Sequence, residues 1–168
     1  MERTVTFNPP VLLALDAGFR ESGWAIFKDE APIESGTISL PGRRTMEHGV
    51  RVSHLIDSLD ELAAAWSPEL VAICHLSGIH WEVPALNLLE SSLLKWSSIL
   101  NLPQFSYTTR EVRKAIAGDS QATSATLVYA TMVGSGSVGQ KKSTAEWKAI
   151  AVGYCHLIRK TEIDPVPA

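Results

Sequence analysis

The feature that most constrains the fold is a short apolar strand that ends on a carboxylate. Residues 11–15 read Val-Leu-Leu-Ala-Leu and follow a pair of prolines. An uninterrupted apolar run of this length is typical of a strand buried on both faces of a sheet. Asp16 comes directly after it, so we expect a carboxylate at the end of a central strand.

The rest of the chain alternates between strand and helix patterns. Residues 23–28 and 33–40 predict two strands that form an antiparallel meander with the first one. Apolar residues at spacings of three and four over 45–66 predict an amphipathic helix that Ser67-Pro68 ends. The other expected elements are strands at 70–74 and 105–108, helices at 85–100, 124–133 and 143–159, and a short helix that carries Arg110, Arg113 and Lys114. Thr109 or Ser106 is the expected cap of that short helix.

Length and composition fit one domain with its own core. The chain has 168 residues, of which 45% are hydrophobic and 20% charged, close to the average for globular proteins. We therefore expect a single domain over 1–168 with its core at about 11–160. Cys74 and Cys155 form no recognisable metal pattern, and no stretch approaches the roughly 20 apolar residues of a membrane span. The start also lacks the apolar core of a signal peptide, which predicts a cytoplasmic protein without membrane association.

Four segments resemble one known family in the same order along the chain. The stretch from Leu15 to Ala25, LDAGFRESGWA, resembles the opening motif of RuvC-type Holliday junction resolvases. In that motif a strand ends in Asp, a Gly follows two residues on, and a second Gly begins the next strand. Residues 34–38 are similar to the family's third strand, 102–114 to its fifth strand and basic helix, and 145–152 to the start of its last helix. The resemblance covers roughly residues 11–157.

This resemblance implies a fold and a metal site. The fold would be α/β and RNase H-like, with a central mixed five-stranded sheet, three antiparallel strands then two parallel ones, flanked by helices. The family cuts branched DNA as a homodimer with two Mg²⁺ ions held by four acidic positions. Asp16 and Glu146 match two of these and are the candidate metal ligands, whereas Cys74 and Ser143 occupy the other two.

Half of the implied metal cage is therefore substituted. A thiol is a poor Mg²⁺ ligand and a hydroxyl a weak one. Glu82 is the nearest replacement and a third candidate catalytic residue, and His75 or His80 would supply a nitrogen. In a regular strand, however, His75 points to the opposite face from Cys74.

Simpler interpretations account for the same residues. Ser143 and Glu146 have the spacing of a helix capping box, which would explain both without catalysis. Cys74 ends an apolar strand and fits an inert core thiol. Asp16 would then merely cap the turn before Gly18.

The charge of the chain bears on DNA binding in two ways. A net charge of −3 argues against a dedicated nucleic-acid binder, which usually has a basic excess. A local basic face remains compatible with this total, because only charges within a Debye length of roughly 10 Å of the phosphates matter much. The candidate nucleic-acid-binding residues are Arg20, Arg113, Lys114, Lys141 and Lys142, with Arg43 and Arg44 beside them. Scattered basic residues are also typical of an ordinary solvated surface.

Three functional hypotheses follow. The first is a RuvC-like protein that has lost catalysis and binds branched or structured DNA or a protein partner, and we prefer it because of Cys74 and Ser143. The second is an active Mg²⁺-dependent, structure-selective endodeoxyribonuclease. The third, an actin-like ATPase whose phosphate loop contains Asp16, requires two such domains around a cleft, and this chain is too short for both.

Overall fold

A computed structural model describes residues 9–40, 47–75 and 84–163, with side chains as far as 161. These residues contain one five-stranded sheet with the order β3-β2-β1-β4-β5. The strands are β1 (Leu12–Asp16), β2 (Glu21–Lys28), β3 (Ala31–Ser39), β4 (Leu70–His75) and β5 (Gln104–Thr108). The first three pair antiparallel, while β4 runs parallel to β1 and β5 parallel to β4. This confirms the predicted mixed sheet.

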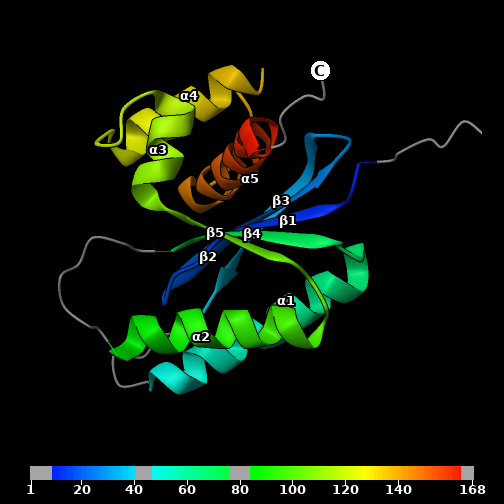
Figure 1. The fold of residues 1–168 in the computed structure, drawn as a ribbon. Helices are drawn as coiled ribbons and strands as arrows, with labels where there is room; N and C mark the ends of the chain where they lie inside the picture. The colour runs from blue at the N-terminus through cyan, green and yellow to red at the C-terminus, as the bar shows by residue number, and fades with distance from the viewer. Residues whose placement is uncertain (1–8, 41–46, 76–83, 164–168) are drawn as a thin grey trace, which may run out of the picture.

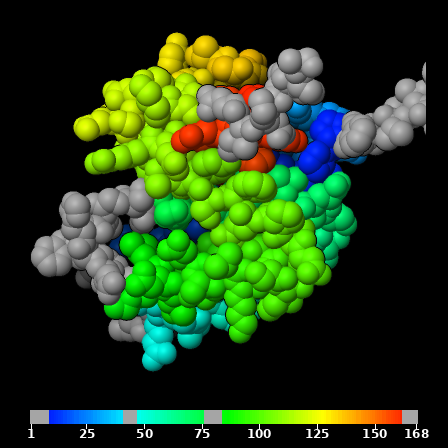
Figure 2. Space-filling model, in the orientation of Figure 1, coloured from blue at the N-terminus to red at the C-terminus, as the bar shows by residue number. Residues whose placement is uncertain are grey.

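Helices cover both faces of the sheet (Figure 1). One layer consists of α1 (His48–Trp66) and α2 (Pro84–Ile99), and the other of α3 (Thr109–Ala117), α4 (Ser124–Gly134) and α5 (Thr144–Ile163). In the space-filling view the two helical layers lie above and below a band in which atoms of the blue N-terminal strands reach the surface (Figure 2). None of the helices in the described ranges is long and apolar enough to cross a membrane.

The central strand β1 supplies side chains to two cores. Leu12 and Ala14 belong to the core under α3, α4 and α5, whereas Leu13 and Leu15 belong to the core over α1 and α2. This division follows from the alternation of side chains along a strand. Both Leu13 and Leu15 are fully buried, and each contributes about 2 kcal/mol of hydrophobic stabilisation. Asp16 continues the row of Leu12 and Ala14, so it faces α5.

Helix α5 lies unusually close to the sheet. A Cβ atom added at Gly23 of β2 would come within 1.9 Å of the backbone oxygen of Ala145, and one added at Gly153 would come within 2.1 Å of the Phe27 ring. Only glycine permits either approach, because any side chain there would overlap atoms already in place. Gly23 is also the β2 partner of Asp16. The first turn of α5 is thereby held next to the end of β1.

The predicted elements are found within a few residues of their expected ends, with one correction at a helix cap. Thr108, and neither Thr109 nor Ser106, caps α3. Its hydroxyl accepts a hydrogen bond from the backbone N–H of Glu111, whose carboxylate accepts one from the N–H of Thr108. The expectation was wrong because β5 extends through Thr108, which places the first helical residue at Thr109.

Candidate functional site

Asp16 and Cys74 lie side by side at the ends of two parallel strands. Asp16 is paired with Cys74 of β4 on one side and with Gly23 of β2 on the other. Neighbouring residues of adjacent strands point to the same face, so the carboxyl and the thiol both face α5. The substituted acidic position and the retained one are therefore adjacent.

A cavity of about 210 Å³ opens at this place. Its polar lining comes from five elements: β1, β2, β4, α3 and α5. Among the residues that line it are Asp16, Glu21, Cys74, Thr109, Arg113 and Lys148. Lys148 and Val152 lie one helical turn apart on α5 and both line the cavity, so this face of α5 forms its wall.

The carboxyl of Asp16 is in an unfavourable place for a charge. Burial raises its pKa from 3.8 to about 6, and the positive charge of Lys148 offsets part of this rise. The side chain of Asp16 accepts no hydrogen bond from the described residues, and no ion pair within 4.0 Å joins it to Lys148. A buried carboxyl without such partners costs folding free energy.

The thiol of Cys74 is unfavourably placed to ionise. Burial and, to a smaller extent, the charge of Asp16 raise its pKa from 9.0 to about 12, against smaller opposing effects of Thr109 and Lys148. The sulfur lies 3.9 Å from the Thr109 hydroxyl. Only the thiolate is a nucleophile or a metal ligand, so Cys74 supplies neither function near neutral pH.

Glu146 does not line this cavity, and its hydrogen bonds hold the start of α5. Its carboxylate accepts hydrogen bonds from the backbone N–H of Ser143 at 2.7 Å and from the hydroxyl of Ser35 at 3.2 Å. The Ser143 hydroxyl in turn accepts one from the N–H of Glu146 at 3.1 Å, so the predicted capping box is present. Burial by itself would raise the pKa of Glu146, but the hydrogen bonds from Ser143 and Ser35 and the charge of Lys142 lower it overall.

These residues do not fit a Mg²⁺ site. Within the described ranges, no three His, Cys, Asp or Glu side chains converge in a way that would hold a metal ion. The carboxylates at the cavity are Asp16 and Glu21, and they share it with the cations Arg113 and Lys148. Mg²⁺ prefers several oxygen ligands and no neighbouring cations. The proposed replacement ligands Glu82 and His80 lie outside the described residues.

Of the expected basic residues that the structure describes, Arg113 is the one that lines the cavity. Its Nε is buried without a hydrogen-bond partner in the described part of the chain. Arg20, Lys114 and Lys141 are exposed, and Lys114 donates to the backbone oxygen of Gly118. Lys142 donates to the hydroxyl of Ser35 at 2.9 Å. Arg43 and Arg44 lie outside the described residues.

Lys148 was absent from the sequence-based candidates. The signal that could have found it is its position as the one charged residue in the apolar run from Trp147 to Cys155. Such a residue is rarely buried without a reason. In the structure it is half-buried at the wall of the cavity.

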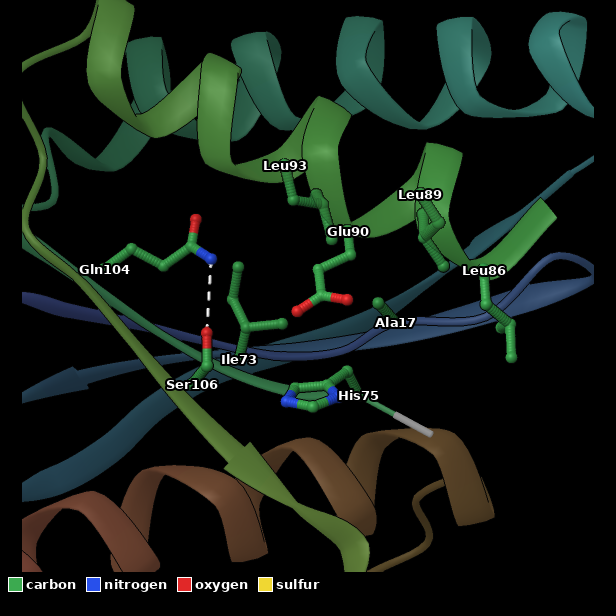
Figure 3. A pocket seen from close by; sticks show the side chains of 9 residues that line it. All are labelled: Ala17, Ile73, His75, Leu86, Leu89, Glu90, Leu93, Gln104 and Ser106. Atoms are coloured by element: carbon green, nitrogen blue, oxygen red, sulfur yellow. Dashed lines mark hydrogen bonds between the residues drawn. The ribbon is translucent and has the colours of Figure 1, made fainter. Parts of the chain in front are cut away.

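His75 faces mainly the other helical layer, as strand alternation predicts. It lines a small cavity of about 30 Å³ with Ile73 of β4 and Leu89 of α2, although it also reaches the rim of the Asp16 cavity. Figure 3 shows Glu90 reaching from α2 toward this small cavity. The space is enough for about one water molecule. It does not bring His75 into a ligand set with Asp16.

Comparisons with solved structures identify the fold. RuvC of Thermus thermophilus matches with a TM-score of 0.73 and 15% identity over 90% of this chain and 96% of its own. The same protein in complex with a Holliday junction substrate matches equally well, with a TM-score of 0.73 and 15% identity over 92% of this chain and 96% of its own. The yeast mitochondrial Holliday junction resolvase matches with a TM-score of 0.61 and 14% identity over 95% of this chain and 83% of its own.

These similarities show that the chain has the RNase H-like fold of the RuvC-type resolvases, as the sequence resemblance implied. No family model matches the sequence, and no curated protein is similar enough to count as a relative.

Proposed function

We propose that this protein binds branched or structured DNA through the surface around the Asp16 cavity, without cutting it by metal-dependent hydrolysis. The shared fold supports the DNA-binding part, because a RuvC of this fold has been solved with a Holliday junction substrate. The observation that carries the second part is the cavity itself. It keeps one carboxyl at the end of β1 but has a thiol and a lysine beside it.

Binding of DNA is tested by fluorescence anisotropy in the presence of a chelator. A labelled four-way junction, a fork and a linear duplex of equal length are titrated with protein at several salt concentrations. We expect the branched substrates to bind more tightly than the duplex. The affinity should fall steeply with salt, because each phosphate contact releases counterions. Absence of binding to all three would reject the proposal.

The position of the interface is tested with single variants of the basic residues. Arg113→Gln, Lys114→Gln and Lys141→Gln are each expected to reduce the slope of log affinity against log salt by about 1 if the residue contacts a phosphate. Lys28→Gln is the matched control, because Lys28 is exposed at the end of β2 that lies farthest from the Asp16–Gly23 pair. An equal loss in this control would indicate a different binding face.

Cleavage is tested with the same substrates in Mg²⁺ and in Mn²⁺. We expect them to remain intact at high protein concentration. Cleavage that disappears in Asp16→Asn would instead support the alternative, an active Mg²⁺-dependent endodeoxyribonuclease. That outcome would leave the DNA-binding part of the proposal standing.

We also propose that the protein forms a homodimer through α2. Leu94 and Ile99 of this helix are 56% and 69% exposed, and Ile99 lines an apolar groove between α1 and α2. Exposed apolar patches of this kind are typical of interaction surfaces. Analytical ultracentrifugation should show a dimer that Ile99→Glu converts to a monomer, whereas a monomeric parent protein would contradict this assignment.

A further inference from the structure

Lys148 provides a positive charge at the place where the resemblance implies a metal ion. It lines the same cavity as Asp16, and its charge lowers the pKa of both Asp16 and Cys74. It is half-buried, and its helix is held against the sheet by the contact between Gly23 and Ala145. The backbone of α5 therefore fixes the position of Lys148 at the wall of the cavity that Asp16 also lines.

Among the described residues that line the cavity, the charges balance without a metal. Asp16 and Glu21 contribute two carboxyl groups, and Arg113 and Lys148 contribute two cations. A divalent ion beside Asp16 would be repelled by both cations across a partly desolvated space, where charges interact more strongly than in water. It would also have to bind without Glu146, whose oxygens are used by Ser143 and Ser35.

We infer that Lys148 supplies the positive charge that a divalent metal ion would otherwise supply beside Asp16, so that this cavity binds neither Mg²⁺ nor Mn²⁺. The ammonium of Lys148 balances the charge of the Asp16 carboxyl. Asp16 by itself offers too few ligands to hold a metal ion. This inference goes beyond the proposed function, because it concerns the charge balance of the cavity and holds whether or not DNA is bound.

The test replaces the ammonium by a carboxylate and measures Mn²⁺ binding. Free Mn²⁺ is followed by electron paramagnetic resonance during titration of the full chain and of Lys148→Asp. The matched control is Lys141→Asp, which makes the same change of charge at an exposed lysine outside the cavity. A double variant, Lys148→Asp with Asp16→Asn, shows whether any new site uses Asp16.

We expect no Asp16-dependent Mn²⁺ binding by the parent protein at millimolar concentration. Lys148→Asp should bind Mn²⁺ more tightly than Lys141→Asp by at least about tenfold, the change that even outer ligands of a metal site produce. The double variant should lose this gain. The inference is overturned if the parent protein binds Mn²⁺ in a way that Asp16→Asn abolishes, or if Lys148→Asp binds no better than Lys141→Asp.

Circular dichroism shows whether Lys148→Asp is folded. If it is not, Lys148→Gln replaces it and is expected to bind Mn²⁺ more tightly than the parent protein, with equal binding contradicting the inference. Because no DNA is present in these titrations, failure of the proposed DNA binding and failure of this inference are separate outcomes.

Discussion

Asp16 and Glu146 both lie where the first turn of α5 meets the sheet, yet their surroundings are opposite. Glu146 accepts hydrogen bonds from the backbone of Ser143 and from the Ser35 hydroxyl, and its pKa is lowered overall. Asp16 is half-buried at the end of a strand, its side chain accepts no hydrogen bond from the described residues, and its pKa is raised to about 6. The hydrogen bonds of the Glu146 carboxylate stabilise the fold, whereas the Asp16 carboxyl lowers its stability.

This difference separates a structural acid from a functional one. Glu146 occupies an acidic position of the resemblance, but the capping box and the contact with β3 already account for it. Nothing in the packing accounts for Asp16, because an apolar residue would fit the strand at lower cost. Residues that lower the stability of a fold are expected mainly at functional sites. Asp16 is therefore the residue around which a function should be sought.

The largest effect is expected from a substitution that disrupts the contact between Gly23 and Ala145, which positions the first turn of α5 beside the end of β1. Gly23→Val would place side-chain atoms on the backbone of Ala145, and we expect it to lower the free energy of unfolding by about 3 kcal/mol. Urea denaturation measures this. Gly49→Ala on the exposed start of α1 is the control, since no atom lies within 4 Å of its added Cβ, and it should stabilise by about 0.5 kcal/mol. A silent Gly23→Val would mean that α5 lies farther from the sheet.

The second test uses the pH dependence of stability. The folded pKa of Asp16 lies above its ordinary value of 3.8, so the folded state holds a proton between about pH 4 and 6 that the unfolded state has lost. Stability should fall as pH rises through this window and then stay level. The cost is about 3 kcal/mol at neutral pH, and Asp16→Asn should remove it. Urea denaturation of both proteins with a chelator checks this, and parallel pH profiles would show that Asp16 is not buried as described.

Glu146 should behave in the opposite way. Glu146→Ala removes the capping box and the bond to Ser35, and we expect a loss of about 1.5 kcal/mol in the free energy of unfolding. Glu61→Ala, on the exposed face of α1, should change stability by less than about 0.5 kcal/mol. A Glu146→Ala protein of unchanged stability with impaired DNA binding would refute the structural assignment.

The smallest effect is expected at Ser35, which links Lys142 to Glu146. Ser35→Ala removes the hydroxyl that donates to Glu146 and accepts from Lys142, and should cost about 0.7 kcal/mol. Ser39→Ala, at an exposed position of the same strand, is the matched control. If the two variants are equally stable, Glu146 does not depend on β3.

Most of the fold could be predicted because its signals are local. The apolar runs of β1 and β4, the turn between β2 and β3 and the periodicity of α1 each lie within a few consecutive residues. The cap of α3 was misplaced because three neighbouring hydroxyl residues, Ser106, Thr108 and Thr109, are all capable of capping, and only the end of β5 selects one of them.

The site was only half predictable, because its decisive contacts are distant in sequence. The hydroxyl that donates a hydrogen bond to Glu146 belongs to Ser35, 111 residues earlier. Lys148 was not predicted because the resemblance directs a search toward carboxylates, whereas the structure shows that a cation also lines the Asp16 cavity. The spacing of Ser143 and Glu146, in contrast, predicted the capping box correctly because both partners lie in one helical turn.

The arrangement of β1 against α5 also has a consequence for how the chain folds. The meander of β1, β2 and β3 involves residues close in sequence, so it is expected to form early, whereas the pairing of β1 with β4 must wait for a long loop to close. Helix α5, the last helix of the described residues, covers the first strand of the sheet. Asp16 therefore remains solvated, without a free-energy cost of burial, until α5 docks on the sheet. The free-energy cost of its burial falls on the final step of assembly, so changes at Asp16 should alter the unfolding rate more than the rate at which the meander forms.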